Sequence, residues 1–418
     1  MKQKFAVIAG AVLTSLTLAA CNQSGQPLQN QAVQNHPGNT TNSTGVKQTS
    51  NNTTAANTTN TTANATAQAG TAGNSTTNST GAANAGSANQ TAQNTSPSGA
   101  ATTPSGATSA SDALPGNLLI ADRGNSRLLI VNPQKQIIWE MSIPTHGPHN
   151  ANSLGADDAF FTPDGKHIII NEEDNQMLGV IDIATKKFVW TYGHPGVAGS
   201  APGYLNTPDD AYMLPNGDVT VADIKNQRIL FISPSGHVIK QYGTTGYRYH
   251  NPPKSFAAPN GDTPLPDGGT LVTEIGGSYA DRLDPNGKLS WTVHFTDINY
   301  PSDAQLLENG NILVADYSTP GRVEIVTQKG ARVWEYYKTS GPGKLAQPSL
   351  AKMLPNGYVI VNDDYNHRVV IINPSTNQIV WQYGHSGVAG TAPGYLNTPD
   401  GMDFMPATWT LPTVATGQ

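Results

Sequence analysis

The sequence predicts an all-β protein, a six-bladed β-propeller whose first blade is closed by the C-terminal strand. An apolar strand that ends in an acidic residue recurs at intervals of 50, 51, 51, 42 and 47 residues, which is the length of one four-stranded blade. Pro-Asn-Gly or Pro-Asp-Gly turns precede several of these strands. The repeating region starts with the second strand of a unit and ends with a first strand, so the two partial units complete one blade.

The N-terminus has the features of an export signal. Lys2 and Lys4 precede the apolar run from Phe5 to Leu18, which is too short to span a membrane. The run ends in Leu18-Ala19-Ala20-Cys21 and resembles a bacterial lipoprotein signal, in which the cysteine is lipidated after cleavage. We expect a signal peptide over residues 1–20, lipidation of Cys21 and an extracytoplasmic protein anchored to the cell membrane or outer membrane. The alternative is an ordinary secretory peptide with an incidental cysteine.

The segment after Cys21, over residues 21–113, predicts a linker. It consists almost wholly of Asn, Thr, Ala, Ser, Gly and Gln, has no aromatic residue, and carries only Lys47 and Asp112 as charges. Such a composition cannot bury enough apolar surface to offset the entropy of ordering. We interpret it as a disordered spacer between membrane and domain, with O-glycosylation as a further use of its hydroxyl groups.

Charge and cysteine content limit the function classes. The chain has 23 Lys and Arg, 29 Asp and Glu, and one Cys. Only Lys2, Lys4, Lys47 and Asp112 precede residue 113, which leaves the rest with a net charge of about −8 and argues against nucleic-acid binding. A single cysteine allows no intramolecular disulfide, so the domain folds by packing alone, and we expect a monomer.

The predicted propeller covers residues 114–406 and a tail covers 407–418. The middle strands of its units, such as Arg228–Ile232 and Arg368–Ile372, are near-continuous apolar runs, as expected for strands covered on both faces. Each outer strand carries an aromatic residue at a similar place: Trp139, Trp190, Tyr242, Trp291, Trp334 and Trp381.

The two ends of the repeat region predict how the ring closes. Gly116–Asp122 is a second strand without a first, and Leu396–Met405 is a first strand without a second. Pairing them removes the open sheet edge that invites aggregation. The segment Gly193–Asp209 recurs almost unchanged as Gly384–Asp400, and we expect both copies on one face of the ring.

A six-residue motif follows three of the strand-ending acids: Asp122–Arg127, Asp223–Arg228 and Asp363–Arg368 share the pattern Asp-x-x-Asn-x-Arg. This pattern resembles the signature of NHL repeats, and the linkers with Gly-Tyr-Leu-Asn-x-Pro are similar to the NHL interblade segment. The resemblance implies an NHL-type propeller over residues 114–406. It is weaker at Glu172 and Asp316, and weakest at Glu274, where Gly276-Gly277 follows.

The strand-ending acids are interpreted as structural. Their repetition with Asn and Arg predicts carboxylates that accept loop N–H groups and pair with arginine, and the alternative is a catalytic or metal-binding ring. The acids are Asp122, Glu172, Asp223, Glu274, Asp316 and Asp363.

Acids at the start of the first strands are candidates for a metal or ligand site. First strands line the channel of a propeller, so these carboxylates should converge at its mouth and repel one another unless a cation neutralises them. Ca²⁺ is the candidate cation, since it prefers oxygen ligands, and solvated acids are the alternative. The candidates are Asp157, Asp158, Asp209, Asp210, Asp303 and Asp400.

Histidines in the interblade loops are a second set of candidates. Three histidines can hold Zn²⁺ with one position open for water, although none of these has the spacing of a strong zinc motif, and ordinary surface histidines are the alternative. His149, His194, His385 and Arg248 are the loop candidates, with His146 and His250 nearby.

Two function classes remain. The first is a binding or scaffold module that offers its loops to a protein, peptide or glycan partner while its lipid holds it at a membrane. The second is a metal-dependent enzyme with its site at the channel mouth, because six-bladed relatives include amidating lyases, lactonases and sulfotransferases. No local motif of these enzymes maps onto this sequence, and fold alone does not fix function, so binding is favoured.

Overall fold

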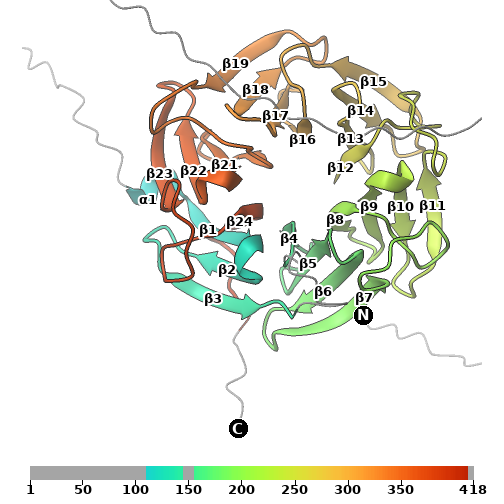
Figure 1. The fold of residues 1–418 in the computed structure, drawn as a ribbon, viewed down its shortest axis with the longest axis horizontal. Helices are drawn as coiled ribbons and strands as arrows, with labels where there is room; N and C mark the ends of the chain where they lie inside the picture. Colours follow the sequence, from blue (N-terminus) through green and yellow to red (C-terminus); the bar gives the residue numbers. More distant parts are fainter. Residues whose placement is uncertain (1–109, 145–154, 413–418) are drawn as a thin grey trace, which may run out of the picture. The chain divides into compact units, whose positions relative to one another are not determined.

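The computed structural model describes residues 110–144 and 155–412, and shows six four-stranded antiparallel sheets around a central channel (Figure 1). The sheets are the six blades, numbered here in chain order. One short helix, α1 (Ala110–Ala113), precedes them. The prediction of an all-β, six-bladed propeller is confirmed.

The blades contain the following strands. Blade one has β24 (Pro399–Pro406), β1 (Gly116–Asp122), β2 (Arg127–Val131) and β3 (Ile137–Ser142); blade two has β4 (Ala159–Phe161), β5 (His167–Glu172), β6 (Met177–Asp182) and β7 (Lys187–Gly193); blade three has β8 (Pro208–Met213), β9 (Val219–Asp223), β10 (Arg228–Ile232) and β11 (Val238–Tyr242); blade four has β12 (Pro259–Pro264), β13 (Thr270–Glu274), β14 (Tyr279–Leu283) and β15 (Leu289–His294); blade five has β16 (Pro301–Leu306), β17 (Ile312–Asp316), β18 (Arg322–Val326) and β19 (Arg332–Tyr337); blade six has β20 (Ala351–Met353), β21 (Val359–Asp363), β22 (Arg368–Asn373) and β23 (Gln378–Gly384).

The C-terminal strand closes the ring, as predicted. β24 pairs antiparallel with β1, with Gly116 opposite Pro406 and Asp122 opposite Pro399. Met402 and Met405 of β24 are buried. The last strand of the chain is therefore the inner strand of the first blade.

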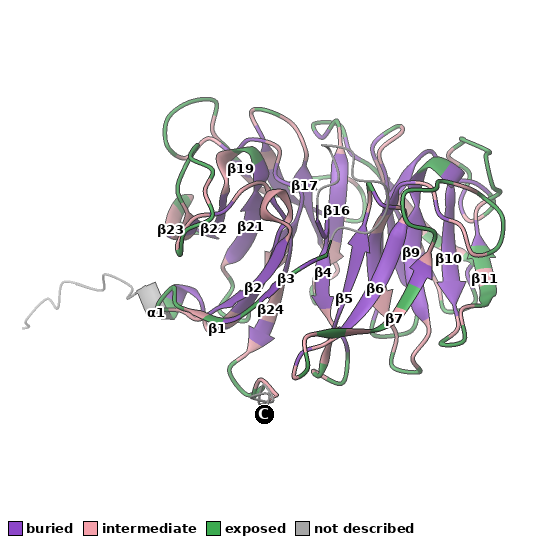
Figure 2. Cartoon of the chain, turned by 60° about the horizontal axis from the view of Figure 1, so that its bottom comes forward, coloured by how far each residue is buried: buried purple, intermediate pink, exposed green. Residues whose placement is uncertain are grey.

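The core lies between the blades. Every residue of β9 and β10 is buried, and Figure 2 shows the mostly buried middle strands of blades one and two, which are β1, β2, β5 and β6. The sandwiching of blade between blade explains why these strands are apolar on both faces.

Outer-strand tryptophans link four of the six blades to the next blade. In four blades the indole Nε1 donates a hydrogen bond to a carbonyl oxygen of the following blade. The pairs are Trp139 with Ile183 (2.9 Å), Trp190 with Pro234 (3.1 Å), Trp334 with Pro374 (3.1 Å) and Trp381 with Pro133 (3.3 Å). The last pair joins blade six to blade one, so these hydrogen bonds also connect the two blades at which the ring closes.

Three strand-ending acids share one set of contacts. One oxygen of Asp122, Asp223 and Asp363 accepts an interblade-loop N–H at 2.7 Å, and the other pairs with the Nε of an arginine. The arginines are Arg127 at 2.7 Å, Arg228 at 2.8 Å and Arg368 at 2.6 Å. Each acid thus ties its blade to the loop that enters from the preceding blade.

The other three acids differ in their partners. Glu172 accepts a hydrogen bond from Asn175 at 2.7 Å. Asp316 accepts N–H groups of Asn299 and Tyr300, while Arg322 pairs with glutamates instead. In blade five the expected pairing between Asp316 and Arg322 is therefore absent.

Several predicted features lie outside the described residues: the signal peptide, Cys21, nearly all of the linker, His146, His149 and residues 413–418. Within the described residues no helix has the length and hydropathy needed to cross a bilayer. The segment after β24 packs on blade two, where Trp409 lies edge-on to Phe161 with ring centroids 5.9 Å apart.

Candidate functional site at the channel mouth

One face of the ring, called the loop face here, carries the interblade loops and the turns between second and third strands. The first strands begin at this face, and their opening residues surround the channel mouth (Figure 1). The antiparallel ladder shifts register at these residues in blades one, three, four and five. Such a bulge breaks the usual alternation of side chains, which explains how adjacent acids can both be withdrawn from solvent.

Asp209 and Asp210 illustrate the effect. Asp210 has a φ of 34°, and the register shifts between Asp209 and Ala211. Asp210 is 3% exposed. The two neighbouring carboxylates therefore turn towards different acids inside the channel, described next as an upper and a lower cluster.

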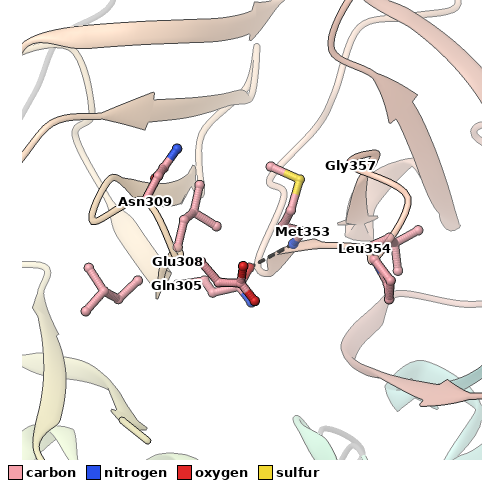
Figure 3. Close-up of a pocket in the computed structure, with 9 residues that line it drawn as sticks. Gln305, Glu308, Asn309, Met353, Leu354 and Gly357 are labelled. Atoms are coloured by element: carbon pink, nitrogen blue, oxygen red, sulfur yellow. Dashed lines mark hydrogen bonds between the residues drawn. The ribbon is translucent and has the colours of Figure 1, made fainter. Parts of the chain in front are cut away.

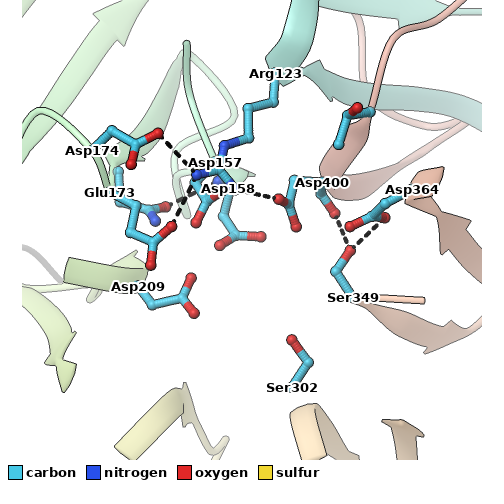
Figure 4. Close-up of polar contacts among 12 residues, drawn as sticks. Arg123, Asp157, Asp158, Glu173, Asp174, Asp209, Ser302, Ser349, Asp364 and Asp400 are labelled. Carbon is cyan, nitrogen blue, oxygen red and sulfur yellow. Dashed lines mark hydrogen bonds and ion pairs between the residues drawn. The ribbon is translucent and has the colours of Figure 1, made fainter. Parts of the chain in front are cut away.

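The upper cluster lies at the mouth. Asp157, Asp158 and Asp209 each offer an oxygen, and these atoms lie within 4.8 Å of one another. Asp400 and Asp364 adjoin them through Ser349, whose Oγ is 2.9 Å from Asp364 Oδ1 and 2.7 Å from the Asp400 carbonyl oxygen (Figure 4).

Arg123 reaches into this cluster from the turn after β1. Its guanidinium pairs with Asp157, with Asp400 at 2.7 Å and with Glu173 at 2.9 Å, and Figure 4 shows it directed at these acids. The side chain is only 12% exposed. Burial alone lowers the pKa of Arg123, but the carboxylates of Asp157, Asp400 and Glu173 outweigh burial and raise it, so the residue is a fixed positive charge at the mouth.

The lower cluster contains Asp210, Asp303 and Asp262. Gly261 allows them to approach, because a Cβ at this position would lie 2.8 Å from Asp303 Oδ1 and 3.0 Å from Asp210 Oδ2. Asp262 is fully buried, and the Thr220 hydroxyl is the hydrogen-bonding group beside its carboxylate. Lys352 is the nearby cation, and its Nζ pairs with Asp403 at 3.0 Å.

The acids of both clusters resist ionisation. Burial raises the pKa of Asp158 to about 7, and the charge of Asp400 adds to the effect. Burial also raises the pKa of Asp209, Asp210 and Asp262 well above the ordinary carboxyl value, with further contributions from neighbouring carboxylates. At neutral pH the clusters therefore either keep protons or need a cation.

The donor set suits a hard cation. Ca²⁺ takes six to eight oxygen ligands, and the carboxylate oxygens of either cluster are of this kind. Arg123 already neutralises part of the upper cluster, whereas no Lys or Arg of the described residues forms an ion pair with Asp210, Asp262 or Asp303. An uncompensated buried carboxylate is costly, so the lower cluster has the stronger need for a cation.

The loop histidines do not gather at the mouth. His194 stacks on Tyr204 at 3.9 Å and His385 on Tyr395 at 4.0 Å. His250 contacts Glu274 instead, and His149 lies outside the described residues. No three histidines of the described ranges come close enough to share one metal ion, so these ranges hold no three-histidine zinc site.

The loop that joins blades three and four is the most aromatic part of the loop face. Tyr247 and Tyr249 are 57% and 64% exposed, with ring centroids 5.2 Å apart, and the exposed Arg248 lies between them in sequence. The loop is held by the Thr244 hydroxyl, which donates to the Lys254 carbonyl at 2.8 Å, and by the fully buried Phe256. It therefore presents these side chains from an ordered backbone.

A separate pocket lies away from the mouth. It has a volume of about 540 Å³ and is formed by turns of blades five and six, where Gln305 Oε1 accepts the Met353 N–H at 2.8 Å (Figure 3). Most of its lining is aliphatic or backbone, and none of the sequence candidates lies in it.

Four residues of the channel were not among the sequence candidates: Arg123, Glu173, Asp364 and Asp262. The first three directly follow strand-ending acids, at a variable position of the repeat. Asp262 stands one residue beyond the two aligned positions that were compared. Comparing the residue after each strand-ending acid, and three rather than two residues at each bulge, would have found them.

The sheet topology and the acidic mouth define a six-bladed β-propeller with a carboxylate-lined channel. No protein-family model matches the chain, and no curated protein matches it. A protein of unknown function from Bacteroides caccae is similar in structure, with 20% identity, a TM-score of 0.49, and coverage of 69% of this chain and 98% of that one. A catalytically inactive virginiamycin B lyase from Staphylococcus aureus with quinupristin has 16% identity, a TM-score of 0.40, and coverage of 56% and 71%. A chain of a nidogen/laminin complex has 11% identity, a TM-score of 0.48, and coverage of 68% and 97%.

Proposed function

We propose that the protein is a lipid-anchored, extracytoplasmic NHL-type propeller that binds a protein or peptide partner through its loop face. The observation that carries the proposal is the exposed group of Tyr247, Arg248 and Tyr249 on an ordered loop. Tyrosine and arginine are enriched where proteins bind one another. An ordered loop also loses little conformational freedom on binding.

Arg123 favours binding over catalysis at the mouth. A catalytic acid must reach its substrate, but the carboxylates of Asp157 and Asp400 are buried and already pair with the Arg123 guanidinium. In this proposal the channel is structural, and Ca²⁺ among Asp210, Asp262 and Asp303 stabilises the ring. The alternative, a metal-dependent enzyme, predicts instead that a small molecule displaces Arg123 from these acids.

The test places a photo-crosslinking amino acid at Lys254, an exposed residue of the same loop, in the full chain in the cells that make it. We expect a defined protein or peptide adduct that is lost when Tyr247→Ser and Tyr249→Ser are combined. The same probe at Val333, an exposed residue of the outer strand β19, is the matched control. Identical adducts from both positions, or adducts indifferent to the tyrosines, would refute the proposal, and a carbohydrate adduct would replace the partner class with a glycan.

The anchor is tested separately. Cys21→Ser removes the thiol that a lipoprotein signal modifies, so we expect loss of fatty-acid labelling and loss of membrane association. Equal labelling of the Ser variant and the unchanged chain would contradict a lipid on Cys21. This result bears only on attachment, since Cys21 precedes the propeller.

A further inference from the structure

Blade four departs from the repeat at the position where four other blades place an arginine, which pairs with the strand-ending acid in blades one, three and six. Tyr279 lies opposite Glu274 in the strand ladder, as Arg127 lies opposite Asp122 and Arg228 opposite Asp223. A tyrosine cannot neutralise the carboxylate of Glu274. No Lys or Arg among the described residues forms an ion pair with this glutamate, which is fully buried.

In blade four, His250 and Asp281 lie beside Glu274 in place of the arginine. His250 Nδ1, from the loop between blades three and four, lies 2.9 Å from Glu274 Oε1 and 3.7 Å from Asp281 Oδ2. One ligand atom from each residue lies within 4.8 Å of the others. A second buried carboxylate has therefore been added beside the first, although the arginine has been lost.

Each carboxylate has one oxygen held and one directed at the histidine. Glu274 Oε2 accepts the N–H of Ala257, and Asp281 Oδ1 accepts the hydroxyl of Thr292 at 2.6 Å. Asp281 is fully buried, and its carboxyl faces both the carboxyl of Glu274 and His250 Nδ1, which lies 3.7 Å from its Oδ2. Outer contacts of this kind orient the ligands of metal sites.

The histidine is also held in place. Its ring stacks on Tyr279 with centroids 3.6 Å apart and planes 9° from parallel, so Tyr279 fixes the ring plane. The side chain is 25% exposed, which leaves the imidazole accessible from solvent.

The donor atoms select the kind of cation. Imidazole nitrogen and carboxylate oxygen are both zinc ligands, whereas Ca²⁺ prefers oxygen alone. At zinc–ligand distances of about 2.1 Å, tetrahedral ligand atoms lie about 3.4 Å apart. The 2.9 and 3.7 Å separations from His250 Nδ1 lie on either side of that value.

We propose that His250, Glu274 and Asp281 form a Zn²⁺ site in which the ion takes the place of the arginine found in blades one, three and six. The fourth coordination position of the ion is open to water, because the His250 side chain is partly exposed. The ion fastens the loop between blades three and four to β13 and β14. This site shares no residue with the channel clusters, and the proposal does not depend on the loop face having a partner.

The test measures Zn²⁺ bound to the purified full chain by equilibrium dialysis, with Co²⁺ absorption as a report of tetrahedral nitrogen and oxygen ligands. Asp281→Asn and His250→Gln should each lose one equivalent of Zn²⁺, or weaken its binding by about 100-fold or more. Tyr279→Arg should restore the arginine pairing of the other blades, remain folded and also lose the ion. His294→Gln, a nearby histidine outside the ligand set, is the control and should bind as the unchanged chain does.

Two outcomes would overturn the proposal. The first is a chain that binds no Zn²⁺ at neutral pH, in which case Glu274 and Asp281 share a proton instead. The second is Zn²⁺ binding that both His250→Gln and Tyr279→Arg leave unaltered. If Asp281→Asn does not fold, His250→Gln still decides the matter, because this residue lies at the surface and its loss leaves both carboxylates in place.

Discussion

Replacing Asp158 by asparagine tests whether the channel acids repel one another. Asp158 is 6% exposed, and burial together with the charge of Asp400 raises its pKa to about 7. The folded state therefore holds this proton more tightly than the unfolded chain, whose aspartates titrate near pH 4. The stabilisation is complete below about pH 4 and is lost as the pH rises towards 7.

The magnitude follows from that shift. About three pKa units at 1.36 kcal/mol each give about 4 kcal/mol of stability lost by pH 8. An amide has nearly the same shape and no charge, so Asp158→Asn should be more stable than the unchanged chain by up to this amount at pH 8 in chelator. At roughly 2 °C per kcal/mol for a domain of this size, the melting temperature should rise by about 8 °C. The difference should vanish near pH 4.

The assay is thermal unfolding followed by circular dichroism between pH 4 and 8.5, with and without chelator. Glu308→Gln, a substitution in an exposed turn, is the control and should leave the pH profile unchanged. Adding Ca²⁺ at 100 times its Kd should stabilise the unchanged chain by about 2.7 kcal/mol, and should stabilise Asp210→Asn, which lacks one carboxylate of the lower cluster, less. An asparagine variant that is less stable than the unchanged chain at pH 8 in chelator would refute the reasoning.

Arg123→Gln should destabilise the ring by about 3–5 kcal/mol at pH 8 in urea unfolding, because it leaves Asp157 and Asp400 buried without their cation. Arg332 has a 43% exposed side chain, so the control Arg332→Gln should change the free energy of unfolding by about 1 kcal/mol or less. Equal effects of the two substitutions would contradict a buried role for Arg123. Deleting residues 399–418 removes β24 and exposes β1, so size-exclusion chromatography should show loss of the monomer. The control deletion of residues 413–418 should leave the monomer intact. If the chain without residues 399–418 is a soluble monomer with an unchanged melting temperature, closure by β24 is contradicted.

The fold could be predicted because its determinants are local and repeated. The strand Gly116–Asp122 has the predicted bounds, and its lack of a preceding partner in the sequence indicated that β24 must supply one. The acids at aligned positions of first strands also converge, since topology places every first strand around one axis. The sequence repeats thus predict both the number of blades and the residues that line the channel.

The details of the site depend on contacts that repetition does not encode. Arg123 fills the mouth because one blade has arginine at a position where Ile224 and Ile275 stand in two others. The positions of two loop histidines likewise depend on a local contact, because His194 stacks on Tyr204 of its own loop and the duplicated linker repeats the stack at His385.

The buried acids of the channel and those of blade four can be distinguished by the ions that they bind. The channel offers oxygen atoms alone, whereas blade four offers an imidazole, and the two sets share no residue. Ligands that bind independent sites of the folded state contribute independently to its stability. The melting shifts produced by Ca²⁺ and by Zn²⁺ should therefore add when both ions are present. Asp210→Asn should reduce only the Ca²⁺ shift and Asp281→Asn only the Zn²⁺ shift. If either variant reduces both shifts, or if the second ion adds nothing to the first, both ions bind in one place and the assignment of two sites is wrong.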